Sequence, residues 1–159
     1  MLSTNHHINF DVTEVELVYK NKIPAKDRLK VASSQAAHDV FRLAWDENLI
    51  DLVEEFKIIL LAANNTVIGL SHVAKGSTTQ CLADPKIVFA ICLKSNASAI
   101  CLAHNHPSGN PCPSETDLQL TAKFCEAARL LDIKVLDHLI LTRHGYTSLE
   151  DDGLMPSFN

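Results

Sequence analysis

The stretch from His104 to Asp117, H-N-H-P-S-G-N-P-C-P-S-E-T-D, limits what this chain can fold into more than any other part of it. An apolar run, residues 97–103, precedes it and an amphipathic run follows it, which predicts a buried strand, a loop and a helix. The prolines and the glycine keep the loop out of helical conformation. Side chains two apart in extended chain point the same way, so His104 and His106 can reach one point.

Ser114 can cap the following helix, which puts Asp117 in the first helical turn, where the helix dipole favours an ionised carboxylate. S-x-x-D alone is an ordinary capping motif, and two loop histidines are commonly just exposed. Their combination predicts a metal site on His104, His106 and Asp117. Two neutral imidazoles and one carboxylate, with one position left open, are a common arrangement for catalytic zinc.

Hydrolysis at such a site also needs a general base, and a carboxylate at the end of a neighbouring strand would serve. Glu54 and Glu55 open a strand-like run that continues to Ala62. Two glutamates before a strand are equally an ordinary polar boundary. The local sequence does not decide between these explanations.

The remaining patterns predict alternating strands and helices in the order β-α-β-β-α-β-α-β-β, which gives a layered α/β (α+β) domain with a mixed sheet. The helix over 86–96 is apolar almost all round, so it should be well buried. The predicted strands cover 12–19, 54–62, 66–74, 98–103, 133–142 and 146–148, and the predicted helices cover 34–48, 86–96 and 114–131.

Composition restricts the class of protein. A chain of 159 residues with 47% hydrophobic and 21% charged residues fits one globular domain. The formal net charge of −5, without a basic stripe, argues against tight binding to nucleic acid backbones. Five cysteines without a CxxC pair favour a reducing cytoplasm over a disulfide framework. Neither a signal peptide nor a membrane span is expected.

Two competing sites are weaker. Zinc deaminases use H-x-E with P-C-x-x-C, whereas Cys112 has no CxxC partner, so it is best explained as an incidental loop thiol. Asp137 and His138 are neighbours in a predicted strand, so they point to opposite faces and cannot pair with each other. One of them is a candidate hydrogen-bond partner for a ligating histidine, although structural packing is the simpler explanation.

The spacing of these motifs resembles a known family. H-N-H-P followed by S-x-x-D, with seven residues between His106 and Ser114, resembles the JAMM motif of MPN-domain metalloproteases. The longer match, with L-L-D-I-K-V-L-D-H-L-I-L-T downstream and Glu54-Glu55-Phe56 similar to an E-x-F segment upstream, resembles the RadC family, which was named for DNA repair. The likeness assigns 31–154 to a RadC-like MPN (JAMM) domain, 1–30 to an N-terminal strand and connection, and 155–159 to a tail.

The resemblance implies a cytidine-deaminase-like MPN fold, a mixed curved sheet with helices packed on it. It implies one zinc ion, Zn2+, on His104, His106 and Asp117. Glu54, which fits the E-x-F register better than Glu55, would activate the water, and Ser114 would help stabilise the oxyanion. The implied function is a zinc-dependent hydrolase of JAMM type that cleaves peptide or isopeptide bonds of a protein or peptide substrate. The alternatives are a non-catalytic MPN-like scaffold and a DNA-repair-associated factor.

The sequence also departs from its relatives. JAMM peptidases usually have Ser or Thr between the two histidines. This chain has Asn105 there, as the RadC branch does. Residues 83–86 read A-D-P-K where many relatives read H-P-R-E. The chain has no room for the N-terminal helix-hairpin-helix region of full-length RadC proteins, so we expect a short form in which direct DNA binding is doubtful.

Overall fold

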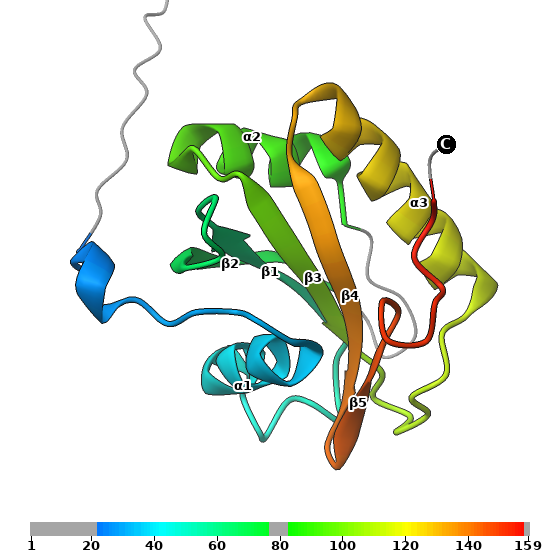
Figure 1. Ribbon diagram of the computed structural model, residues 1–159. Helices are drawn as coiled ribbons and strands as arrows, with labels where there is room; N and C mark the ends of the chain where they lie inside the picture. The colour runs from blue at the N-terminus through cyan, green and yellow to red at the C-terminus, as the bar shows by residue number, and fades with distance from the viewer. Residues whose placement is uncertain (1–21, 77–82, 158–159) are drawn as a thin grey trace, which may run out of the picture.

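The fold is a five-stranded mixed sheet with helices on both faces, seen in a computed structural model that describes residues 22–76 and 83–157 (Figure 1). The strand order is β2-β1-β3-β4-β5, in which β3 and β4 are parallel and the other neighbours are antiparallel. This confirms the mixed α/β fold predicted from the sequence. The elements are a short 3-10 turn Ala25–Asp27, α1 Ser34–Ala44, β1 Glu55–Leu61, β2 Val67–Lys75, α2 Pro85–Ser95, β3 Ala99–Asn105, α3 Glu115–Leu130, β4 Lys134–Thr142 and β5 Gly145–Ser148.

The sheet separates two apolar cores. In Figure 1, α1 lies on one face, whereas α2 and α3 lie together on the other. Along β1, Phe56 and Ile58 pack in the core under α2 and α3, and Ile59 and Leu61 pack in the core beneath α1. Every residue of β1 and β3 is buried, which is the expected result when a near-continuous apolar strand lies between two layers of helices.

The helix boundaries follow local capping chemistry. The Ser33 hydroxyl accepts a hydrogen bond from the amide of Ala36 and so caps α1. The prediction that α1 runs to Asn48 is wrong, since the helix ends at Ala44. The carboxylate of Asp46 accepts from the backbone and side-chain nitrogens of Asn48, and this local turn competes with another helical turn.

Helix α2 begins at Pro85, one residue before its predicted start, and the Asp84 carboxylate caps it by accepting from the backbone of Lys86. It is less buried than its composition predicts. Ile87 and Leu93 are 50% and 55% exposed, because α2 covers the sheet from outside and buries only one side of its surface.

Strand β3 continues to Asn105, two residues beyond the predicted end. Its parallel pairing with β4 continues as far as Asn105 opposite Leu141, and the amide of His106 then donates to the carbonyl of Leu141 at 2.9 Å. His104 therefore lies within the strand, not after it. The predicted strand over 12–19 lies outside the described residues. Within the described parts of the chain, no helix has the length and apolar character needed to cross a bilayer.

Asn105 fastens the segment before β1 to the sheet. Its side chain is completely buried, and its Oδ1 atom accepts from the amide of Glu55 at 2.8 Å. Its Nδ2 atom donates to the carbonyls of Ile50 and Val53 at 2.7 and 2.9 Å. One amide side chain thus bonds to three backbone groups, and it fixes where the chain enters β1. Asn105 therefore stabilises the fold on one face of β3, while the two histidines on either side of it point to the other face.

Replacing Asn105 with alanine should lower the free energy of unfolding by roughly 2–4 kcal/mol, since buried backbone groups lose their partners. Urea unfolding of the purified protein measures this change. The exposed Asn48 offers a matched control, for which Asn48→Ala should change the stability by less than about 0.5 kcal/mol. Equal stability losses in the two variants would contradict the assignment.

Candidate metal centre

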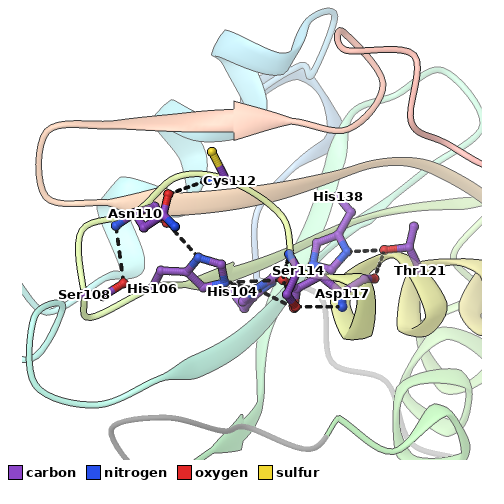
Figure 2. A network of polar contacts seen from close by, with 9 residues as sticks. All are labelled: His104, His106, Ser108, Asn110, Cys112, Ser114, Asp117, Thr121 and His138. Carbon is purple, nitrogen blue, oxygen red and sulfur yellow. Dashed lines mark hydrogen bonds and ion pairs between the residues drawn. The ribbon is translucent and has the colours of Figure 1, made fainter.

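Three side chains, from β3, the loop after it and α3, meet at the end of β3. The Nε2 atoms of His104 and His106 lie 3.0 Å apart. The Asp117 carboxylate approaches them with Oδ1 3.1 Å from His104 Nε2 and Oδ2 3.4 Å from His106 Nε2 (Figure 2). Among the described residues, this is the group of histidine, cysteine and acidic side chains whose arrangement could hold a metal ion.

The spacing of these atoms fits a metal ion. In a tetrahedral site with bonds of about 2.0–2.2 Å, neighbouring ligand atoms lie about 3.3–3.6 Å apart. Here one ligand atom from each residue lies within 4.8 Å of the other two, and the two Nε2 atoms are 3.0 Å apart, close to that range. Two imidazoles and one carboxylate also supply the nitrogen and oxygen donors that zinc and related divalent ions accept. The cluster could therefore hold one ion with a coordination position left over.

The loop after β3 orients His106. Its Nδ1 atom lies 2.8 Å from the carbonyl oxygen of Asn110, so that atom carries the proton and Nε2 faces the cluster. Gly109 has a φ of +76°, a left-handed conformation that suits glycine, in the turn after His106. The hydrogen bond and charge of Asp117 raise the pKa of His106 above its ordinary value, although burial acts in the opposite direction.

Asp117 is held by the start of α3. Its Oδ2 atom accepts from the amide and hydroxyl of Ser114 at 2.7 and 2.6 Å, while the amide of Asp117 donates to the Ser114 hydroxyl oxygen. This capping box places the carboxylate before any ion binds. Burial alone would raise the pKa of Asp117, but the neighbouring His104 and His106 rings and the Ser114 hydroxyl hold it well below its usual range.

Glu54, which precedes β1, and Glu55, its first residue, lie on different faces of the sheet. Phe56 is paired with His104 at the end of the β1–β3 ladder, and Glu54 stands two residues before Phe56, on the same side of an extended chain. The Glu54 charge also contributes to the raised pKa of His106, after the larger effects of Asp117, burial and Asn110. Glu54 therefore lies on the metal-cluster side of the sheet.

Glu55 lies on the opposite side. Its carboxylate is 2.9 Å from Lys57 Nζ and 3.8 Å from Lys75 Nζ. Lys57 is fully buried, donates to the carbonyl of Ala44 and sits 4.0 Å from the ring centroid of Trp45. Burial lowers the pKa of Lys57, and the neighbouring Glu55 carboxylate opposes that effect. The Glu55 side chain is thus committed to an ion pair beneath α1.

His138 and Thr121 form a chain of hydrogen bonds to the ring nitrogen of His104 that faces away from the cluster. His104 Nδ1 lies 2.8 Å from His138 Nε2, and His138 Nδ1 lies 2.6 Å from the hydroxyl of Thr121 (Figure 2). The ring of Phe56 stacks over that of His104 with 6.2 Å between centroids. The sequence pointed to His138 only as one of two candidates, and it gave no reason to single out Thr121 in α3.

Cys112 and Asp137, which were considered as parts of other sites, do not face the metal cluster. Cys112 is exposed, and its sulfur points away from the three candidate ligands in Figure 2. Asp137 faces away from His138, as expected for neighbours in a strand. Its carboxylate accepts from the hydroxyl of Ser148 and the amide of Glu150, so it secures the segment after β5.

Comparisons with known proteins agree with this geometry. A family model described as a RadC-like JAB domain matches residues 31–154. A UPF0758 protein of Symbiobacterium thermophilum is 44% identical over 103 residues, which cover 65% of this chain and 44% of that protein. A UPF0758 protein of Moorella thermoacetica is 42% identical over 117 residues, covering 74% of this chain and 51% of that protein.

A third relative, a UPF0758 protein of Alkaliphilus metalliredigens, is 36% identical over 134 residues, covering 84% of this chain and 58% of that protein. The chain thus spans about half the length of the curated relatives it matches. The matched region contains the whole of the metal cluster and both glutamates. This chain therefore belongs to the family of RadC-like JAB domains, as the resemblance of its motifs indicated.

Proposed function

We propose that this chain is a zinc-dependent hydrolase that cleaves peptide or isopeptide bonds. The observation that carries the proposal is the convergence of the Nε2 atoms of His104 and His106 with the Asp117 carboxylate at 3.0–3.4 Å, on the side of the sheet where Glu54 lies. A zinc ion bound there would make water acidic near neutral pH and would polarise a carbonyl group. The residues around it supply the other parts of a hydrolytic reaction.

Glu54 is the proposed proton carrier. Its carboxylate accepts a proton from the attacking water as the water oxygen bonds to the carbonyl carbon. It then delivers that proton to the nitrogen as the carbon–nitrogen bond breaks, so the products are a carboxylic acid and an amine. Its charge acts on His106 and contributes to the raised pKa of that ring, which supports this role, whereas the Glu55 carboxylate is engaged with Lys57 at 2.9 Å.

Ser114 is the proposed donor to the oxyanion that develops on the carbonyl oxygen. Its hydroxyl donates to Asp117 Oδ2 at 2.6 Å, while its amide donates to the same oxygen at 2.7 Å. The amide alone can keep the carboxylate in place when the hydroxyl turns toward the substrate. Ser114 is exposed at the entrance to α3, which leaves it room to do so.

The proposed substrate is a protein or peptide, because the candidate ligands lie close to the surface. The His106 and Asp117 side chains keep 17% and 13% of their surface exposed, so a bond in an extended or loop segment can approach them. DNA is a poorer partner for this chain, whose formal net charge is −5. A non-catalytic scaffold remains the rival proposal, and the Glu54 experiment below distinguishes the two.

Protein purified without a histidine tag should bind about one zinc ion per chain, and His106→Ala should abolish stoichiometric binding. Elemental analysis after dialysis measures both. The exposed His144 provides the control, since His144→Ala should keep the ion. Zinc at 100 times its Kd should add about 2.7 kcal/mol to the unfolding free energy of the wild type. A wild-type protein without stoichiometric metal would contradict the proposed centre.

Glu54→Gln should lower turnover by roughly 10²- to 10⁴-fold while zinc content and fold persist, because the amide cannot carry the proton. Cleavage of linear peptides and of peptides branched through a lysine amine, run in ¹⁸O-labelled water, detects hydrolysis as label in the new carboxyl group. Glu55→Gln is the matched variant: it should reduce stability but leave the turnover of the folded fraction near the wild-type value. A wild type that cleaves none of these peptides, with zinc bound, would favour the scaffold.

Ser114→Ala should lower kcat by about 10²-fold through loss of the oxyanion donor. It should also lower the unfolding free energy by about 1 kcal/mol, since the helix cap is lost. Ser114→Thr retains a hydroxyl and should recover most of kcat in the same peptide assay. Equal kcat values for the alanine and threonine variants would rule out the donor role and leave Ser114 only its capping role.

A further inference from the structure

Behind His104 lie two residues that take no direct part in the proposed reaction. We infer that His138 and Thr121 are positioning residues, which hold a proton on Nδ1 of His104 and so keep its Nε2 atom available for the metal ion. The inference rests on the proposed metal centre, but it does not depend on hydrolysis.

The chain of hydrogen bonds begins at Thr121. Its Oγ1 atom lies 2.7 Å from the backbone carbonyl oxygen of Asp117 and 2.6 Å from Nδ1 of His138. A carbonyl oxygen can only accept, so the single proton of the hydroxyl must lie between Thr121 and Asp117. Toward His138 the hydroxyl can then only accept, and Nδ1 of His138 must carry a proton.

The same reasoning passes through His138 to His104. A neutral imidazole with a proton on Nδ1 has a bare Nε2 atom, which can only accept. His138 Nε2 lies 2.8 Å from His104 Nδ1, so His104 must donate from that atom. The other ring nitrogen, Nε2, is the one that faces His106 and Asp117. Figure 2 shows the whole order, from the Thr121 hydroxyl through both rings to the ligand cluster.

Burial makes this order hard to reverse. His138 and Thr121 are 0% exposed, and the ring of Phe56 lies 5.6 Å from that of His138. Moving the His138 proton to Nε2 would point it at the Nδ1 proton of His104 and leave Thr121 without its donor. Such mismatches are costly where solvent cannot compensate for them.

His106 shows why the threonine is needed. Its Nδ1 atom donates to a backbone carbonyl, Asn110 O, which can only accept and so fixes the ring by itself. His104 instead faces another imidazole, which could donate or accept at the same atom. For His104, the backbone carbonyl that fixes the direction of the hydrogen bonds is that of Asp117. It acts through Thr121 and then His138. Partners of this kind are worth about 10- to 100-fold in metal affinity.

The test compares Thr121→Val, which replaces the hydroxyl with a methyl group, with Thr121→Ser, which keeps it. Long-range ¹H–¹⁵N NMR at mildly alkaline pH reports which ring nitrogens of His104 and His138 carry protons, in metal-free and zinc-loaded protein. Competition with a chelating dye gives the zinc Kd. Thermal unfolding confirms that each variant is folded at the temperature of measurement.

We expect protons on Nδ1 of both rings in the wild type and in Thr121→Ser, with similar zinc affinity. Thr121→Val should show the His138 proton shared between its two nitrogens, and its zinc Kd should rise by about 10- to 100-fold. A wild-type His138 protonated on Nε2, or a valine variant with unchanged ring signals and Kd, would overturn the inference. Because the ring signals are read in metal-free wild type, they remain decisive even if zinc does not bind or no peptide is cleaved.

Discussion

The pairing of β3 with both of its neighbours determines where His104 and the rings around it lie. The antiparallel register with β1 sets Phe56 against His104, and the parallel register with β4 brings His138 to the same side of the sheet. Because side chains alternate along a strand, a shift of one residue in either register would send these rings to the opposite core. Asn105, buried on that opposite side, opposes such a shift, since its amide group bonds to the chain before β1.

The sheet also keeps two sets of charges apart. On one side, the Asp117 carboxylate lies against two imidazole rings and accepts from the hydroxyl of Ser114. On the other, Glu55 and Lys57 form an ion pair beneath α1, with the ammonium group against Trp45. Neighbouring glutamates therefore have different surroundings. Glu55 forms an ion pair within the fold, whereas Glu54 lies on the side of the candidate metal centre.

Much of the centre could be predicted from the sequence, because its three candidate ligands lie in one short stretch with distinct local geometry. An H-x-H pattern and an S-x-x-D cap each specify a direction for the side chain, and the stiff loop joins them. Glu54 lies fifty residues upstream of His104, and it was separated from Glu55 only by the family register. His138 and Thr121 were harder to find, since their role depends on which nitrogen faces which partner, and that becomes visible only when α3 and β4 are packed together.

The carboxylate of Asp117 belongs both to the capping box of α3 and to the candidate metal centre. The folding of the helix therefore already fixes the position of the carboxylate, and little conformational entropy remains to be lost when an ion binds. Such a centre can release its ion and take it up again without the domain unfolding, unlike small zinc modules whose fold exists only with the metal. In a cell, the occupancy of this site would then follow the free metal concentration, and the domain would persist as a folded protein at either extreme.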